Sequence, residues 1–380
     1  MLRLLAIWFL ITISFTILSQ TYDTDFFQDP VKNERFDAGV PVFSGILLPL
    51  YSPEMKFSLG SAAVVTFKTR RNNPDLWHSS FPVLFAVNPD GSFRLDLKYE
   101  SFWLDNLIIF NVDADYRKMI DNYWGTGMEH VENIQKGETT TEFRRNSFYL
   151  RPAALVKLVG KFYFGLSADF NRMTALNPAD LMLEDPDILA FGTEIYSAGY
   201  GIIALYDTKD RYNPSAKGFY IKAGGTNYSD KLGSDYHFQQ IAFDFRQFLP
   251  IIRPGSILAL QLKTTLGIGD VPWAMMPQPG GPDDLRGYYQ GKYRDRNAMV
   301  LIAEYRHLFL HKGNDTLSRH GIVYWLGGAT VFHEISAIRN VILSTGIGYR
   351  YRLQPGITLR IDIGFGTENV GIYRGLNESF

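Results

Sequence analysis

The chain has 380 residues, with 38 Lys and Arg against 39 Asp and Glu, 34 glycines, 15% aromatic residues and no cysteine. A net charge near zero argues against a nucleic-acid-binding protein, because such proteins carry a basic excess that displaces counterions from phosphates. A chain without cysteine forms no disulfides and no thiolate metal site. The sequence has a single long uncharged apolar run, residues 4–18, which excludes a membrane protein built of many helices of about 20 apolar residues each. A large soluble protein or a transmembrane β-barrel remains, and the aromatic and glycine content favours the barrel.

The first residues have the pattern of an export signal. Arg3 precedes the apolar run, and polar residues begin at Ser19. The run is short for a spanning helix and matches the core of a signal peptide, so we expect a signal peptide over residues 1–19, cleaved near Ser19. An uncleaved N-terminal anchor is the alternative. The predicted mature chain begins with a short periplasmic segment, residues 20–39, followed by a barrel domain over residues 40–380.

Alternating polarity is the dominant pattern of the mature chain. In residues 93–100 the odd positions are apolar and the even positions are Arg, Asp, Lys and Glu, and similar alternation recurs over 108–117, 343–352 and 357–366. A soluble antiparallel sandwich also alternates. Runs of about 10 to 16 residues, however, exceed the usual globular strand and suit a tilted crossing of the bilayer. Aromatic residues at the strand ends also match membrane girdles, so the pattern favours a membrane barrel.

The predicted fold class is all-β, a 16-stranded antiparallel transmembrane β-barrel with long extracellular loops. The expected strands are residues 40–50, 55–69, 79–88, 91–104, 106–117, 143–158, 161–172, 195–207, 217–229, 235–248, 256–267, 297–310, 319–332, 338–353, 356–366 and 369–380. An even number agrees with bacterial single-chain barrels. Short turns such as 88–91 and 353–356 would face the periplasm. The long connections 118–142, 173–194 and 268–296 would face outward.

The connection 268–296 carries the most specific motif of the sequence. Residues 280–296 read GGPDDLRGYYQGKYRDR. Its candidate site residues are Gly280, Gly281, Leu285, Arg286, Gly287 and Tyr288. A second motif, YDTKDRYNPSAKG, occupies residues 206–218. Its candidate residues are Asp207, Asp210, Pro214 and Gly218.

Together these motifs resemble the BamA/TamA superfamily, also called the bacterial surface antigen family, over residues 41–380. In that family the sixth extracellular loop carries Gly-Gly, then Leu/Val-Arg-Gly-Tyr/Phe, then Tyr-Arg-Asp. A hairpin upstream of this loop carries Asp-x-Arg-Asp, Pro and (Lys/Arg)-Gly. The last two strands end in an aromatic insertion signal, and the resemblance gives the role of C-terminal insertion signal to Phe380. The three motifs occur here in the order and spacing of the family.

The resemblance implies that the sixth loop folds back into the barrel lumen, where the guanidinium of Arg286 docks on acidic groups of the inner wall. A planar fork of five donors pairs well with carboxylates, and each charge-assisted bond contributes about 1.5–3 kcal/mol. By alternation Glu304 and Asp362 project inward, and they are the candidate lumen partners of Arg286. The family also has an acid on the thirteenth strand, which residues 322–332 lack, so we expect Asp362 or Glu304 to replace it. A surface arginine in a mobile loop is the alternative.

The resemblance also implies a function. The family inserts β-barrel proteins into the outer membrane or passes polypeptides across it. Its mechanism uses a weakly closed seam between the first and last strands, here residues 40–50 and 369–380, as a template for a client strand. Members usually carry periplasmic POTRA domains, and residues 20–39 leave no room for one, so the chain resembles the short subgroup of bare barrels.

We therefore expect an integral protein of the bacterial outer membrane, after signal-peptide cleavage, that takes part in the insertion or translocation of proteins. The expected partners are outer-membrane lipid, a client β-barrel or secreted protein, and a separate periplasmic partner. Enzymatic activity, a cofactor, a metal and nucleic acid are not expected. The alternative is a passive channel or a scaffold subunit of an outer-membrane complex, without insertase activity.

Overall fold

The computed structural model of the chain describes residues 30–380 apart from several short gaps. The gaps are residues 53–55, 130, 132–133, 135, 138–139, 211–214, 252, 312–315, 339, 355–356 and 368–369. The predicted signal peptide over residues 1–19 lies outside the described residues, and so does Pro214 of the second motif.

In the described part of the chain, sixteen antiparallel strands form one sheet, and their order in the sheet is their order in the sequence. They are β1 (Val42–Ser52), β2 (Lys56–Phe67), β3 (Ser79–Val87), β4 (Phe93–Trp103), β5 (Ile108–Asn122), β6 (Glu142–Val159), β7 (Phe162–Leu176), β8 (Glu194–Asp207), β9 (Gly218–Tyr228), β10 (Phe238–Pro250), β11 (Ser256–Gly269), β12 (Asn297–Leu310), β13 (Leu317–Phe332), β14 (Ile342–Gln354), β15 (Ile357–Phe365) and β16 (Val370–Leu376). The sixteen predicted strands are therefore confirmed.

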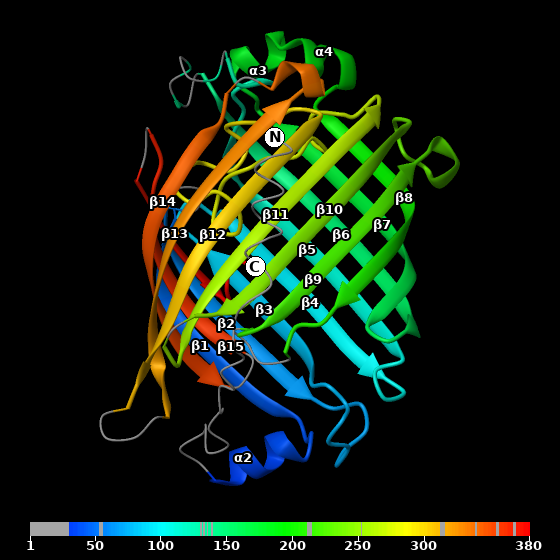
Figure 1. Cartoon of the computed structure of the whole chain (residues 1–380). Coiled ribbons are helices and arrows are strands. Elements are labelled where there is room, and N and C mark those ends of the chain that lie inside the picture. Colours follow the sequence, from blue (N-terminus) through cyan, green and yellow to red (C-terminus); the bar gives the residue numbers. More distant parts are fainter. Residues whose placement is uncertain are drawn as a thin grey trace.

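The described helices are short and lie at the two ends of the sheet (Figure 1). They are α2 (Pro30–Asp37), α3 (Asp180–Glu184), α4 (Pro186–Phe191) and the 3-10 turns η3 (Asp230–Leu232) and η4 (Ile335–Ala337). In the part of the chain that the structure describes, no helix is long and apolar enough to cross a membrane.

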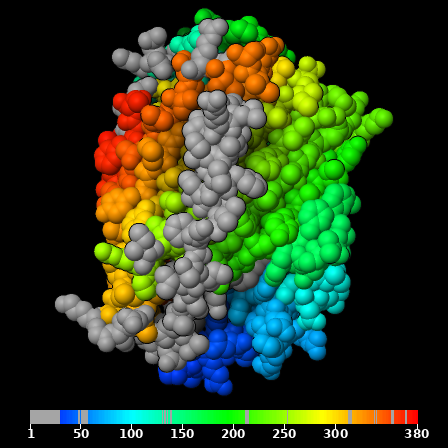
Figure 2. Space-filling model, viewed as in Figure 1, coloured from blue at the N-terminus to red at the C-terminus, as the bar shows by residue number. Residues whose placement is uncertain are grey.

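The tilted strands curve around a common interior in Figure 1. β1 and β16 are the two ends of the hydrogen-bonded ladder. They meet where the guanidinium of Arg374 in β16 donates to the backbone carbonyl of Pro49 in β1. Figure 2, in the same view, shows the blue N-terminal segments at the lower end and the orange and red C-terminal strands on the left.

The antiparallel order decides at which end each connection lies. The long connections 123–141, 177–193 and 270–296 each follow an odd-numbered strand, so they share one end of the sheet with α3 and α4. The turn at 88–91 follows β3 and lies at that same end. Its predicted placement opposite the long loops is therefore wrong, because the parity of the preceding strand sets the end and the length of the turn does not. The turn between β14 and β15 lies at the opposite end.

The two faces of the sheet differ in polarity. In β12 every even-numbered residue from Ala298 to Leu308 is buried, including Glu304, whereas Leu301 is 51% exposed. We call the buried face the inner face and the other one the outer face. Large apolar side chains exposed on the outer face include Tyr200, Ile202, Leu301, Leu326, Leu343, Ile347 and Phe365. An apolar band of this kind suits contact with lipid acyl chains.

Charged side chains of both signs pair on the inner face of β4 and β5. Arg94 Nε lies 2.7 Å from Asp96 Oδ2, and Arg117 Nε lies 2.8 Å from Asp115 Oδ2. The pairs are neighbours, because Asp96 and Asp115 are in register on the two strands. The alternation in residues 93–100 therefore reflects a polar inner wall, on which Arg94 and Asp96 neutralise each other.

Candidate functional site

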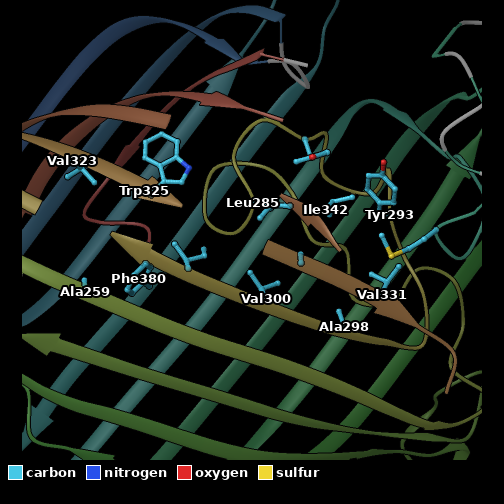
Figure 3. Packing of buried hydrophobic residues seen from close by; sticks show 14 of the residues in the cluster. Ala259, Leu285, Tyr293, Ala298, Val300, Val323, Trp325, Val331, Ile342 and Phe380 are labelled. Atoms are coloured by element: carbon cyan, nitrogen blue, oxygen red, sulfur yellow. The ribbon is translucent and has the colours of Figure 1, made fainter. Parts of the chain in front are cut away.

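The connection 270–296 packs against the inner face of the last strands. The backbone N–H of Gly287 donates to Tyr373 Oη of β16 at 3.0 Å, and Tyr288 Oη donates to the carbonyl of Leu343 in β14 at 2.8 Å. Asp284 pairs with Lys263 of β11 at 2.8 Å. Figure 3 shows Leu285 among buried apolar side chains of the strands. The motif part of the connection is therefore attached to the sheet at several points.

Arg286 is the most constrained residue of this connection, with none of its side chain exposed. Its Nη1 lies 2.9 Å from Asp362 Oδ2 of β15, and its Nη2 pairs with Glu304 Oε1 of β12. Both carboxylates are also fully buried. The structure thus brings Arg286 together with both of its predicted partners, and a single guanidinium bridges β12 and β15.

A second layer of arginines surrounds these carboxylates. Arg306 Nε lies 2.8 Å from Glu304 Oε2, and Arg350 Nη1 lies 2.6 Å from Asp362 Oδ1. Each carboxylate therefore uses one oxygen for Arg286 and the other for an arginine of the sheet. Removing one member of a buried pair of this kind typically costs about 3–5 kcal/mol, because the other charge is left unpaired.

Trp325 of β13 completes the surroundings of Arg286. The guanidinium carbon lies 3.6 Å from the centroid of the indole ring, within the range of a cation–π contact. Trp325 Nε1 also donates to Ser344 Oγ at 3.3 Å, and Ser344 Oγ donates to the backbone carbonyl of Arg286. We call Arg286, Glu304, Asp362 and Trp325 the Arg286 site.

Trp325 was not among the candidate residues, although the sequence contains a signal for it. Alternation with exposed Tyr324 and Leu326 places its side chain on the inner face. The register places it opposite Glu304. β13, the strand on which the family has an acid, thus carries the aromatic ring of Trp325 at this place.

Glycines make room for the backbone of Arg286 and Gly287. A Cβ atom added to Gly364 of β15 would lie 2.7 Å from the carbonyl carbon of Arg286, and one added to Gly366 would lie 2.6 Å from the carbonyl oxygen of Gly287. Gly287 itself has φ of +106°, which residues with a side chain rarely adopt. Any side chain at these positions would push the connection away from β15.

The Gly280–Gly281 pair shapes the start of the motif. Gly280 has φ of +131°, and an added Cβ would lie 2.6 Å from the carbonyl oxygen of Tyr289. The backbone N–H of Gly281 donates to the carbonyl of Tyr288 at 3.0 Å. The motif therefore folds back on itself around Arg286. Arg360 of β15 fixes the intervening turn by donating to the carbonyl of Pro282 at 2.9 Å.

The second motif builds the connection between β8 and β9. Asp210 accepts from the backbone N–H of Ala216 at 2.9 Å, and Asp207 accepts from that of Lys209 at 3.0 Å. Burial raises the pKa of Asp210 to about 6, against the lowering effect of its backbone hydrogen bonds. Gly218 has φ of +109°. This motif has a local structural role, and Ala216 joins it to the buried apolar cluster that contains Phe380.

The chain beyond β16 departs from the predicted last strand. The strand ends at Leu376 and does not continue to residue 380. Asn377 has φ of +64°, a left-handed conformation that asparagine tolerates and that turns the chain inward. Phe380 is consequently 8% exposed and belongs to the same buried cluster as Leu285 and Trp325 (Figure 3). Its role as an insertion signal remains a prediction.

Comparisons with known proteins identify the family. A model of the Omp85 superfamily domain matches residues 122–374. BamA from Haemophilus ducreyi lacking POTRA domains 1-3 has 13% sequence identity and a TM-score of 0.55, over 90% of this chain and 69% of that one. CdiB from Acinetobacter baumannii has 9% identity and a TM-score of 0.49, over 89% of this chain and 59% of that one. No match is found among curated proteins.

The family match covers more than half of the chain, and the fold is the one seen in the BamA structure. The family predicted from the motifs is therefore confirmed at the level of the superfamily. The chain belongs to the Omp85 superfamily, whose outer-membrane β-barrels are involved in inserting or translocating proteins at the bacterial outer membrane.

Proposed function

We propose that this protein is a closed barrel of the bacterial outer membrane that takes part in the insertion or translocation of proteins. The observation that carries the proposal is the Arg286 site. A motif connection is fixed on the inner face by two buried carboxylates and an aromatic ring. A barrel whose wall opens at a seam needs an interior support, and a connection fixed by a buried ionic site can supply one.

The seam between β1 and β16 is the part of the wall that would admit a client strand. β1 spans 11 residues and β16 spans 7, so β16 cannot match the whole length of its neighbour. β1 also contains Pro49, which has no N–H to donate to a neighbouring strand. Unpaired backbone groups at such an edge are a template for an added strand.

The connection 270–296 would then act as an interior brace. It joins β11 and β12 in sequence, and it contacts β14, β15 and β16 through Tyr288, Arg286 and Gly287. While docked, the brace would therefore hold β14, β15 and β16 together next to the edge that β16 presents to β1. Lipid would contact the apolar outer face, and a client barrel or secreted protein would contact the seam. A separate periplasmic partner would deliver the client, after signal-peptide cleavage of this chain near Ser19.

The test is quantitative proteomics of the outer membrane after depletion of the protein, complemented by wild-type or variant alleles. Arg286→Ala is expected to reproduce the depletion, with a broad fall in other barrels. Arg172→Ala is the matched control, because Arg172 forms an ion pair in which both side chains are more than half exposed. Unchanged levels of other outer-membrane proteins after depletion would overturn the proposal and leave a dedicated exporter, a pore or a scaffold.

A further inference from the structure

The residues that follow β16 reach the Arg286 site. We call residues 377–380 the return segment. Asn377 turns the chain, its N–H donates to the carbonyl of Thr358 at 2.6 Å, and its side-chain oxygen accepts from the N–H of Thr358 at 3.3 Å. These bonds to β15 direct the next three residues onto the inner face. The segment therefore lies beside the wall and not in line with β16.

One side chain of the return segment binds Glu304, and another binds the arginine that pairs with Asp362. Ser379 Oγ donates at 2.7 Å to Glu304 Oε1, the oxygen that also pairs with Arg286. Glu378 Oε2 lies 2.7 Å from Arg350 Nε, and the same guanidinium pairs with Asp362. The side chain of Glu378 is only 4% exposed. Glu304 is therefore bonded directly to Ser379, whereas Asp362 is connected to Glu378 through Arg350.

Phe380, the last residue of the return segment, contacts the second arginine that pairs with Glu304. Arg306 donates to the main-chain oxygen of Phe380 at 3.1 Å, and its guanidinium lies 4.6 Å from the centroid of the Phe380 ring. That ring packs at 6.4 Å from the ring of Phe248 in β10. Phe380 therefore fixes the arginine that pairs with the second oxygen of Glu304.

The return segment also adds a buried negative charge beside a cluster of buried arginines. Arg360 pairs with Asp283 of the connection. Arg360 also lies 3.6 Å from Asp362 Oδ2, so four buried arginines, Arg286, Arg306, Arg350 and Arg360, face three buried carboxylates, Glu304, Asp362 and Glu378. Without Glu378, the four guanidinium groups would share two buried carboxylates. Arg350 would then have lost its pair with Glu378 and would compete more strongly with Arg286 for Asp362.

We propose that Glu378 and Ser379 are positioning residues for Arg286, and that the return segment couples the position of β16 to the docking of the connection 270–296. The proposal deepens the proposed function, on which it rests. Because the segment follows β16 directly, a movement of β16 away from β1 would withdraw it from the site. Opening of the seam would then loosen the interior brace, and undocking of the brace would free the end of β16.

The first experiment measures undocking of the connection through a single thiol. The chain has no cysteine, so Leu285→Cys, at a position that is 1% exposed, gives one probe for maleimide labelling of the folded protein in lipid vesicles. Glu378→Gln is expected to raise the labelling rate on the order of tenfold, the size of a coupling between two sites. Ser379→Ala should act in the same direction, and Glu378→Asp should retain part of the protection.

Two controls separate positioning from general loosening. Glu184→Gln makes the same change on an exposed side chain at the end of α3 and should leave the labelling rate unchanged. Met182→Cys places the thiol at a buried position in a different apolar cluster, and its labelling should not respond to Glu378→Gln. Equal acceleration at positions 285 and 182, or no acceleration in a barrel that remains folded, would overturn the proposal.

Coupling of this kind is reciprocal, and reciprocity gives the second test. In a Phe380→Cys background, Arg286→Lys should also raise the labelling rate at position 380, because a coupling between two sites acts in both directions. No response would overturn the proposal. The labelling result can be distinguished from the proteomic test. Coupling with an unchanged outer-membrane proteome would reject the proposed function alone. Altered levels of other barrels without coupling would reject only the role of the return segment.

Discussion

The guanidinium of Arg286 is held from three directions, by Asp362, by Glu304 and by the ring of Trp325. Trp325→Leu removes the aromatic face, and we expect the free energy of unfolding to fall by about 2 kcal/mol or more, since the contact is desolvated. Trp325→Phe keeps an aromatic face and should lose less. Urea titration of the heat-modifiable folded band measures the change. Trp103→Leu, on the outer face, is the control, and an equal loss at both positions would contradict a specific contact with Arg286.

The backbone of Arg286 lies close to that of Gly364 in β15, so we expect a side chain at position 364 to lower stability. Gly364→Ala would place a methyl group 2.7 Å from the carbonyl carbon of Arg286, and such overpacking typically costs about 1–3 kcal/mol. Gly225→Ala is the matched control in β9, where no atom lies within 4 Å of the added Cβ. The same urea titration measures both variants. Similar stabilities of the two would show that the connection does not press on β15 at this point.

The carboxyl group of Asp210, in the connection between β8 and β9, leads us to expect that the free energy of unfolding depends on pH. Burial raises its pKa to about 6, whereas an unfolded aspartate titrates near 3.9. The folded protein therefore binds more protons than the unfolded chain between these two values, and this contribution to stability falls as the pH rises from about 4 to about 6. Asp210→Asn should remove that part of the pH dependence of urea unfolding. Asp270→Asn, an exposed carboxylate, should not, and identical profiles for the two variants would refute the assignment.

The sequence predicted the partners of Arg286 but not the whole of its surroundings. A period of two fixes the face of each side chain, so Glu304 and Asp362 could be placed inward from their strands alone. The ring of Trp325 could be placed inward in the same way. Its contact with Arg286, however, depends on the register of β12 against β13 and on the path of the connection. Glu378 and Ser379 were missed because Asn377 ends the strand, and alternation does not show a change of direction.

At the scale of elements, the strands could be predicted from the sequence pattern, but the end of the sheet at which each turn lies could not be predicted from the length of the turn. Long runs of alternating polarity predict strands, because successive side chains of a strand point to opposite faces of the sheet. The turn at 88–91 was misplaced because its length was taken as a sign of its side. The strand order places it with the long connections, after β3. Counting the strands from the first one gives the end of every turn, provided that no strand is missed.

Packing among the long connections predicts how the barrel conducts ions. Trp273 is fully buried, its ring lies 5.7 Å from that of Tyr123, and its Nε1 donates to the carbonyl of Gly192 at 2.9 Å. It therefore joins three connections at one end of the sheet. We expect small, fluctuating single-channel openings in planar bilayers for the wild type, and larger and more frequent ones for Trp273→Ala. Trp103→Ala is the control, and a large steady conductance of the wild type would favour the passive channel.

At the scale of the whole molecule, the proposed function requires that β1 and β16 separate. The guanidinium of Arg374 reaches the carbonyl of Pro49 across the seam, so Pro49→Cys with Arg374→Cys, joined by a short bis-maleimide, should hold the two strands together. The cross-linked barrel is expected to stay folded and to fail to restore other outer-membrane barrels after depletion. The loss should be nearly complete, because a client strand needs the free edge.

The control places the same cross-link where no opening is proposed. Leu359 and Leu376 are register partners on β15 and β16, and joining Leu359→Cys to Leu376→Cys ties the last strand to its permanent neighbour. This variant should restore barrel levels as the wild type does, because β16 keeps its free edge. If the barrel cross-linked between β1 and β16 were equally active, the seam would not be the route of the client. Interior docking of Arg286 would then serve to stiffen a permanently closed wall.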